Sequence, residues 1–364
     1  MAELRDYIKV KHGFAFKGDH ITANDNGIVL VTPGNFSISG GFKEEKCKFF
    51  DGEYPTDYVL RPGDLIVTMT DLSKAIDTLG YSALVPKSER TYLHNQRIGL
   101  VKIIDEKRLD KHYLYWFMRT SYYQKTIAAT SSGSTVHHTS PDRIMDVEIE
   151  LPDLEKQRAL ATFMDNIESK INTNKQINKN LEQQAQAIYR SWFVNYEPFD
   201  GTKPDDWSDG TIDALGTEII CGKTPSTKKS EYYGGNTPFI TIPDMHGCVY
   251  IVSTERYLSD AGVASQPKKT LPPNTVCVSC IGTAGLVTLV SEESQSNQQI
   301  NSIIPKEGIS VYYIYLLMQT LAETINKLGQ SGSTIVNLNK TQFGKIQVMI
   351  PSKRVLQDFD SLCR

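Results

Sequence analysis

One loop of this sequence combines residue types that bind phosphate groups in other proteins. Gly216, Gly222, Lys223 and Thr224 resemble a phosphate-binding loop. Five residues separate the two glycines where that loop has four, and Pro225 interrupts the turn from loop into helix. We therefore expect no nucleotide site here.

A pair of cysteines suggests metal chemistry. Cys277 and Cys280 have the spacing of half a zinc site. They lie in an alternating run that is typical of a β-strand, and no second close pair accompanies them. Strand cysteines are therefore the favoured interpretation, although Cys221 and Cys248 keep a zinc site open as an alternative.

Motifs for catalysis are not recognisable. The sequence has no Asn-Pro-Pro-aromatic motif of the kind that adenine methyltransferases use. Pro141 and Asp142 begin a nuclease-like pattern, but no lysine follows in the required place. His137 and His138 are a lone pair on a polar stretch, so we expect no metal site there. The residues predict a binding protein, with no catalytic residue and no metal site.

The composition is that of an ordinary globular protein. The chain has 364 residues, 40% hydrophobic and 22% charged, which suits two domains and no membrane span. The first residues show no apolar secretion signal, and six scattered cysteines fit free thiols in a reducing compartment. We therefore expect a cytoplasmic protein.

Charge gives no support to nucleic-acid binding. The formal net charge is −3, and residues 1–150, 151–200 and 201–364 each carry one more acidic than basic residue. No part of the chain is a basic tail or domain. Folding would have to gather the basic residues of any DNA-binding surface.

The chain contains an internal repeat with an offset of 199–200 residues. Three matches recur in the same order in both copies: 113–118 with 313–318, 132–136 with 331–335, and 147–152 with 346–351. Weaker matches lie upstream, such as 95–98 with 297–300. The period is too long for a solenoid, so the sequence predicts a duplicated domain.

Each copy combines strands with a helix. Short β-rich runs are bounded by Gly, Pro and Asn, and they fall at 27–32, 64–70 and 99–104, then at 237–242, 275–281 and 300–304. A helix is expected at 110–128 and again at 310–328. The predicted fold class is α+β, with two similar domains.

The segment between the copies is predicted to be one long helix. Residues 154–192 contain no Gly or Pro. Apolar residues and two asparagines recur with a strict 4,3 spacing at Leu160, Met164, Ile167, Ile171, Asn174, Asn178, Leu181, Ala185, Ile188 and Trp192. This heptad predicts a coiled-coil helix about 58 Å long that needs a partner, with the asparagines fixing register. The alternative is a helix that lies on its own domains.

Several of these segments together resemble the specificity (S) subunits of type I restriction-modification systems. The resemblance is carried by residues 151–157, the heptad helix and its exit at 186–194, and by 222–227 and 233–240, with 69–72, 79–80 and 83–86 in the first copy. It implies two target recognition domains at 1–150 and 200–350. A central conserved region at 151–199 joins them with pseudo-two-fold symmetry, and 351–364 would begin a distal conserved region.

The resemblance also implies a function. Each domain would read one half of a bipartite double-stranded DNA site, and the helix would space the domains and dock methyltransferase (M) subunits. The chain itself would hold no cofactor. S-adenosylmethionine and ATP would be bound by the methyltransferase and restriction (R) subunits. The alternatives are a decoy that titrates methyltransferase subunits, and a single-chain modification enzyme.

Polar residues at matched places in the two copies are the candidates for DNA contact. In the first copy they are Lys17, Asn95, Arg97, Ser132, Ser134, Thr135 and His137. In the second copy they are Lys223, Thr224, Ser226, Gln298, Ser333, Thr334, Asn337 and Lys340. Amide, hydroxyl and guanidinium groups are the usual readers of base edges. The alternative for the Ser-Gly-Ser-Thr loops is that they merely turn the chain or cap a helix.

One departure from the family pattern concerns the partner of the long helix. In the family the second copy is followed by another long helix, whereas here residues 351–364 provide only a couple of turns. We therefore expect another chain to cover the heptad stripe. A second copy, as a homodimer through the central helix, and methyltransferase subunits are equally favoured.

Overall fold

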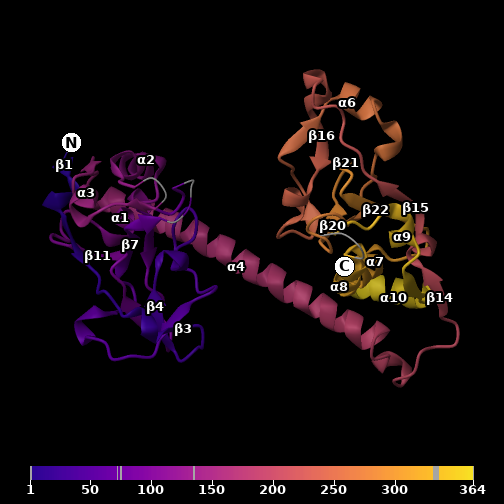
Figure 1. The fold of residues 1–364 in the computed structure, drawn as a ribbon, viewed down its shortest axis with the longest axis horizontal. Helices are drawn as coiled ribbons and strands as arrows, with labels where there is room; N and C mark the ends of the chain where they lie inside the picture. The colour runs from indigo at the N-terminus through magenta and orange to yellow at the C-terminus, as the bar shows by residue number, and fades with distance from the viewer. Residues whose placement is uncertain (1, 72, 74–75, 134–135, 331–335, 364) are drawn as a thin grey trace. The chain divides into compact units, whose positions relative to one another are not determined.

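The computed structural model describes residues 2–363 except 72, 74–75, 134–135 and 331–335. Its contacts divide the chain into unit 1, residues 1–175, and unit 2, residues 176–364. Figure 1 shows unit 1 from indigo to magenta and unit 2 from crimson to yellow. Among the described residues, helices that are long and apolar enough to cross a bilayer are absent.

Unit 1 is built on two main sheets. The four-stranded sheet has the order β2-β11-β7-β9, and the five-stranded sheet has the order β3-β5-β4-β10-β6. Their strands are β2 (Ile8–His12), β3 (Ile21–Thr22), β4 (Ile28–Val31), β5 (Lys48–Phe50), β6 (Val59–Leu60), β7 (Leu65–Thr68), β9 (Ser82–Leu84), β10 (Thr91–His94) and β11 (Ile98–Ile103). Two short pairs join β1 (Ala2–Glu3) to β13 (Glu148–Ile149) and β8 (Thr70–Asp71) to β12 (His137–His138).

Alternation along β7 explains how unit 1 forms its core. Successive side chains of a strand point to opposite faces. Leu65 and Val67 are buried in one cluster with residues of the helices, whereas Ile66 is buried in another with residues of the five-stranded sheet. The helices are α1 (Lys111–Phe117), α2 (Ser121–Thr130) and α3 (Pro141–Met145). The four-stranded sheet therefore has both faces covered.

Unit 2 repeats this plan. Its main sheet has the order β15-β22-β19-β20-β17, beside a three-stranded sheet β18-β16-β21 and the pair β14-β23. The strands are β14 (Ser208–Thr211), β15 (Gly216–Cys221), β16 (Tyr233–Ile240), β17 (Tyr250–Ile251), β18 (Arg256–Leu258), β19 (Val276–Ser279), β20 (Val287–Val290), β21 (Gln295–Ser296), β22 (Ile300–Pro305) and β23 (Gln347–Ile350). The helices are α5 (Ile212–Leu215), α6 (Asp260–Ala264), α7 (Val311–Thr320), α8 (Ala322–Gly329), α9 (Lys340–Gly344) and α10 (Lys353–Cys363).

The registers of the two units correspond. The order β2-β11-β7-β9 of unit 1 matches β15-β22-β19-β20 of unit 2, and the outer pairs in both are antiparallel. The parallel pair Val31–His94 has its counterpart in the parallel pair Ile240–Ser296. The six β-rich runs that the sequence predicts are all strands, and the predicted α+β repeat is confirmed.

The predicted helices 110–128 and 310–328 are wrong in one respect, because each is two helices. In unit 1 the break falls after α1, where the Thr120 side chain accepts a hydrogen bond from the Tyr123 amide and so caps α2. In unit 2 the break falls at Leu321, between α7 and α8. In unit 1 a capping residue inside an apolar pattern thus ends a helix that hydrophobic spacing alone would continue.

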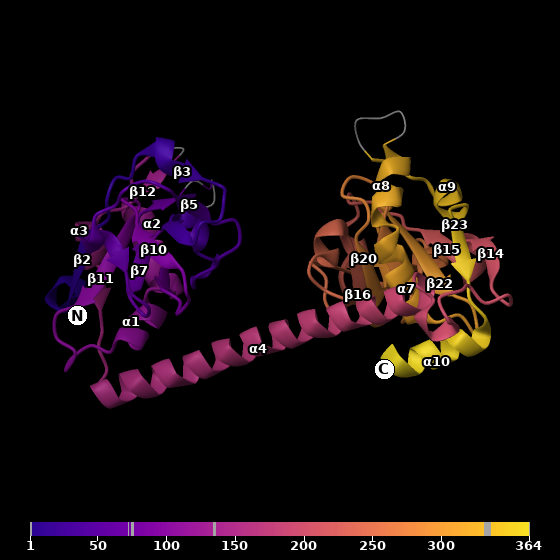
Figure 2. The ribbon, with the colours of Figure 1, turned by 90° about the horizontal axis from the view of Figure 1, so that it is seen from below.

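Helix α4 (Leu154–Phe193) is the predicted long helix. Gln157 anchors its start: the fully buried side-chain amide donates to the carbonyl oxygens of Arg108 and Pro152 and accepts from the Asp110 amide, at 2.8–2.9 Å. In unit 2 the last turns of α4 lie beside α7 and α10, as Figure 2 shows.

Candidate nucleic-acid interface

In unit 1 a tight turn precedes β11, an inner strand of the four-stranded sheet, and lies where that strand begins. The Asn95 side-chain oxygen accepts a hydrogen bond from the Arg97 amide at 3.0 Å, and the Ile98 amide donates to the Asn95 carbonyl oxygen. The Arg97 carbonyl oxygen accepts from the Met69 amide at 2.9 Å, and the Met69 carbonyl oxygen accepts from Thr139 at 3.0 Å. Three separate segments are thereby held at one edge.

Unit 2 contains the same arrangement before β22. The Asn297 side-chain oxygen accepts from the Gln299 amide at 3.0 Å. The Gln299 carbonyl oxygen accepts from the Cys280 amide at 2.8 Å, and the Cys280 carbonyl oxygen accepts from Leu338 at 3.0 Å. We call these two arrangements the reading edges: residues 69–71, 95–98 and 137–139 in unit 1, and residues 280–282, 297–300 and 336–338 in unit 2.

The two reading edges share a backbone but differ in their exposed side chains. Asn95 and Asn297 are buried in both, at 9% and 7% exposure. The residue two positions further on is Arg97 in unit 1 and Gln299 in unit 2. The two reading edges therefore combine a common backbone with different polar side chains.

Beside the unit 1 reading edge, an isolated antiparallel β-bridge joins Ser132, which follows α2, to His138. The backbones of Ser132 and His138 exchange two hydrogen bonds, and the Ser132 hydroxyl accepts from Arg143 at 3.2 Å. His137 and His138 pair with β8, where the Thr70 hydroxyl lies 3.2 Å from the His138 ring. Predicted residues Asn95, Arg97 and His137 therefore converge on one edge, with Ser132 next to it.

In unit 2 the loop after β15 joins the reading edge. The Thr224 hydroxyl donates to the Gln298 side-chain oxygen at 2.8 Å, and the Lys223 amide donates to the Ser296 carbonyl oxygen. The buried Gln266 side chain donates to the Lys223 carbonyl oxygen at 2.7 Å, which fixes the loop from beneath. Asn337 bridges to Ile281. Four predicted residues therefore meet at this edge: Lys223, Thr224, Gln298 and Asn337.

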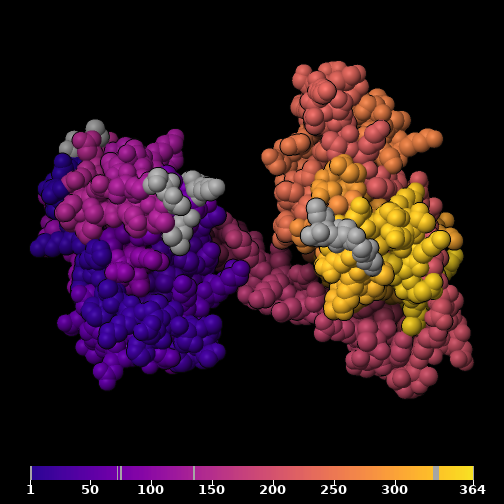
Figure 3. Space-filling model, in the orientation of Figure 1, coloured from indigo at the N-terminus to yellow at the C-terminus, as the bar shows by residue number. Residues whose placement is uncertain are grey.

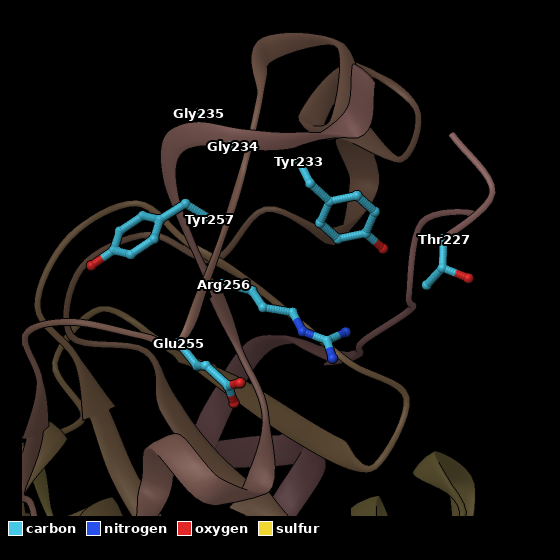
Figure 4. A pocket seen from close by; sticks show the side chains of 7 residues that line it. All are labelled: Thr227, Tyr233, Gly234, Gly235, Glu255, Arg256 and Tyr257. Carbon is cyan, nitrogen blue, oxygen red and sulfur yellow. The ribbon is translucent and has the colours of Figure 1, made fainter. Parts of the chain in front are cut away.

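An open pocket of about 510 Å³ lies further along the same loop. The Tyr233 hydroxyl donates to the Pro225 carbonyl oxygen at 2.8 Å, which ties the pocket to the loop. In Figure 4 the Arg256 side chain extends below the Tyr233 ring toward the segment that carries Thr227, while Tyr257 points to the other side. The pocket thus offers a guanidinium and a hydroxyl between the later part of this loop and strands β16 and β18.

The remaining predicted contact residues stand elsewhere or cannot be placed. Lys17 is exposed ahead of the short helix Gly18–His20, Ser226 is exposed in the loop before Tyr233, and Lys340 is exposed at the start of α9. Ser134, Thr135, Ser333 and Thr334 lie outside the described residues. The cap of α9 is Asn339 and that of α3 is Ser140, so neither short helix takes its cap from a described residue of those loops.

Sequence reasoning missed three residues of the reading edges. Gln96 and His138 are exposed in unit 1, and Gln299 is partly exposed in unit 2. The signal was present in the matched segments 95–98 and 297–300, where the residues after each asparagine could have been taken as a set.

The cysteine pair belongs to the core. Cys277 is buried with apolar residues such as Ile220, Ile240 and Ile300, and burial raises the pKa of Cys277 and Cys280 to about 12. Among the residues that the structure describes, a group of three or more His, Cys, Asp or Glu side chains able to hold a metal ion is absent. Cys277 lies within β19, as expected of a strand cysteine, whereas Cys280 is buried one residue beyond the end of that strand.

The heptad stripe of α4 is open over most of its length. Leu160, Ile167, Ile171 and Leu181 are 41–57% exposed, and all residues from 171 to 180 are exposed. The middle turns are uncovered on the face shown in Figure 3. Exposed apolar stripes of this kind mark interfaces. Asn174 and Asn178 lie in the open stretch, and Met164, 36% exposed, also belongs to the stripe.

The end of the stripe is covered within the chain. Ala185, Ile188 and Trp192 pack against the core of unit 2. The Trp192 ring lies 5.9 Å from the Phe359 ring of α10, measured between centroids. At these three residues the helix lies on its own domain, which is the alternative that the sequence left open. Only the earlier part of the stripe remains exposed.

Unit 1 has an apolar groove beside α1, whereas a side chain of α4 packs at the corresponding place in unit 2. The groove encloses about 500 Å³ and is lined by residues of α1 and α4, among them Tyr113, Trp116, Leu160 and Met164. By the repeat offset, Tyr113 corresponds to Tyr313, against which Phe193 packs in unit 2 with ring centroids 4.8 Å apart.

Comparisons with known proteins agree with this architecture. The sequence matches the family described as Type I restriction modification DNA specificity domain over residues 1–183 and 204–358. The type I restriction enzyme HindI specificity subunit of Haemophilus influenzae is 33% identical over 308 residues, 66% of this chain and 67% of that protein. The MjaIX specificity subunit of Methanocaldococcus jannaschii is 30% identical over 183 residues, 47% of this chain and 42% of that protein.

A solved structure shares the fold. The S subunit of a type I restriction-modification system from M. genitalium superposes with a TM-score of 0.67 at 14% identity, and the match covers 100% of this chain and 87% of that one. The repeat, the long helix and the matches to both halves agree with one another. The chain therefore belongs to the family of type I restriction-modification DNA specificity subunits.

Proposed function

We propose that this chain selects the DNA target of a type I restriction-modification complex, with each unit reading one half of a bipartite site. The observation that carries the proposal is the pair of reading edges, which have the same backbone hydrogen bonds and different polar side chains. Two different domains read two different half-sites, so the whole target need not be a palindrome.

The contacts divide into two kinds. Side chains of the reading edges, such as Arg97 and Gln298, read base edges in the major groove. Lys223 and the pocket with Arg256 grip phosphates, which gives affinity without sequence preference. Because each of the segments 1–150, 151–200 and 201–364 is slightly acidic, the isolated chain binds DNA weakly, and its affinity falls with salt in proportion to the number of phosphates that it contacts.

Helix α4 docks the methyltransferase subunits. The open stripe from Leu160 to Leu181 and the unit 1 groove offer exposed apolar side chains to a partner. The methyltransferase subunits bind S-adenosylmethionine and methylate adenine, and ATP-dependent restriction subunits join them for cleavage. A second copy of this chain, bound through α4 as a homodimer, is the alternative partner for the same stripe.

Reconstitution tests the proposal. Methyltransferase subunits with this chain should methylate adenines within one bipartite motif, and the same subunits alone should methylate none. A complex that assembles but methylates no motif would favour a decoy over a specificity subunit. Light scattering of the purified chain tests whether a second copy or methyltransferase subunits bind the stripe of α4. A dimer that dissociates when methyltransferase subunits are added would show that both partners use the same stripe.

A further inference from the structure

The backbone at positions 97 and 299 is fixed on both sides and in the same way. In unit 1 the Arg97 amide donates to the Asn95 side chain and the Arg97 carbonyl accepts from Met69. In unit 2 the Gln299 amide donates to the Asn297 side chain and the Gln299 carbonyl accepts from Cys280. The Cα atoms of Arg97 and Gln299 therefore occupy equivalent places in the two reading edges.

Arg97 is free to bind. Its side chain is exposed, and the ion pairs and side-chain hydrogen bonds of the described residues do not include its guanidinium. An arginine without a carboxylate partner keeps all five N–H donors for a ligand. Two parallel donors match O6 and N7 of guanine, which is the commonest specific contact of arginine with DNA.

The side-chain amide of Gln299 is held by two hydrogen bonds but can still form others. Its side-chain oxygen accepts from the Asn297 side-chain nitrogen at 3.0 Å, and its side-chain nitrogen donates to the Ile281 carbonyl oxygen at 3.4 Å. One lone pair and one N–H of the amide remain. That remaining pair is the acceptor–donor combination that fits N6 and N7 of adenine, and the two existing bonds orient it in advance.

From these contacts we infer that positions 97 and 299 each specify one base pair at equivalent places of the two half-sites, guanine through Arg97 and adenine through Gln299. This inference rests on the proposed function. It adds which side chains distinguish the half-sites, and it makes Asn95 and Asn297 positioning residues that hold the readers in place.

The test exchanges the two side chains in the complete complex. Arg97→Gln and Gln299→Arg are made separately, and each chain is assembled with methyltransferase subunits. The complex acts on a plasmid library with randomised target sites. The readout is the base preference at each position of the methylated fraction, so that a weakened complex still reports its preference. Arg61→Gln is the matched control, because Arg61 is exposed and lies near the start of β7, whereas Met69 follows its end.

The expected result is a change at one position of one half-site. Arg97→Gln should shift the preference there from guanine toward adenine by about 5- to 150-fold, and Gln299→Arg should do the reverse in the other half. Arg61→Gln should leave the motif unchanged. Unaltered preferences in both exchange variants would overturn the inference, and so would loss of preference throughout a half-site. If the unmodified chain confers no motif at all, the proposed function itself fails.

Discussion

Gly13 packs so closely against Asn95 that a Cβ atom on the glycine would lie 2.0 Å from the asparagine carbonyl oxygen. Gly222 stands in the same relation to Asn297, with a corresponding distance of 2.1 Å. In both units a glycine directly after a strand, β2 in unit 1 and β15 in unit 2, therefore allows the reading edge to close. Because the obstacle is backbone, a larger residue cannot be accommodated by a side-chain rotation.

Gly13→Ala should displace the turn at 95–98 and reduce methylation at sites that depend on the unit 1 half-site, by roughly tenfold or more, in line with the cost of a misplaced reader. Preferences in the other half-site should stay as they were. Gly18→Ala is the control, since a Cβ atom there meets open space. Equal activity of the Gly13 and Gly18 variants would show that the close approach does not position the turn.

Unit 1 should lose stability in mild acid. Burial lowers the pKa of His94 to about 4. The hydrogen bond between its ring and the Ile98 carbonyl oxygen raises the pKa, but burial has the larger effect. The unfolded chain then binds the proton more readily than the folded one, so stability is full above pH ~6.5 and falls until pH ~4. The protection of β10 and β11 amides, taken relative to the intrinsic exchange rate at each pH, should fall over this interval.

Unit 2 provides an internal control, because the counterpart of His94 is Ser296, which does not titrate in this range. His94→Gln should remove most of the pH dependence from the amides of β10 and β11. Protection that falls equally in both units as the pH falls would assign the effect to other groups.

The start of α4 should loosen without Gln157. Gln157→Ala leaves the Asp110 amide and the Arg108 carbonyl oxygen without their partner, at a cost of about 1–3 kcal/mol. The protection of the Asp110 amide from exchange is the measurement. Gln183→Ala, on the exposed part of α4, should leave that protection unchanged. Unaltered protection in the Gln157 variant would mean that apolar packing alone holds α4 to α1.

A charge in the open stripe should weaken partner binding. Ile171→Lys introduces an ammonium group at a position that is 48% exposed in the free chain, so the fold should tolerate it. Affinity for methyltransferase subunits should fall about tenfold or more, because the charge would be buried in the complex. Thr173→Lys makes the same charge change on the opposite face of α4 and should bind as the unmodified chain does. Equal binding of both variants would contradict docking through the stripe.

Periodicity and repetition predicted much of the fold. The absence of Gly and Pro located α4 almost to the residue, the 4,3 spacing marked its apolar stripe, and the offset of 199–200 residues revealed two units with equivalent registers. Family membership confirms that the chain is a specificity subunit and not a catalytic one. These features are local or repeated, so they are visible without knowledge of tertiary contacts.

The details of the site depend on contacts between distant segments. Asn95 could be chosen as a polar residue, but its burial depends on Gly13 and its role on the Arg97 amide. The cover of Ala185, Ile188 and Trp192 likewise depends on the core of unit 2, which a heptad pattern cannot reveal. The pattern shows which side of a helix is apolar, but not what packs against it.

The most direct measurement for the central claim exchanges one unit and determines the methylation motif. Residues 1–150 are replaced by the corresponding segment of a family member with a different target, and the complex with methyltransferase subunits is assayed on DNA with randomised sites. The account predicts that one half of the motif changes to that of the donor while the other half stays the same. A motif that changes in both halves, or in neither, would contradict the assignment of one half-site to each unit.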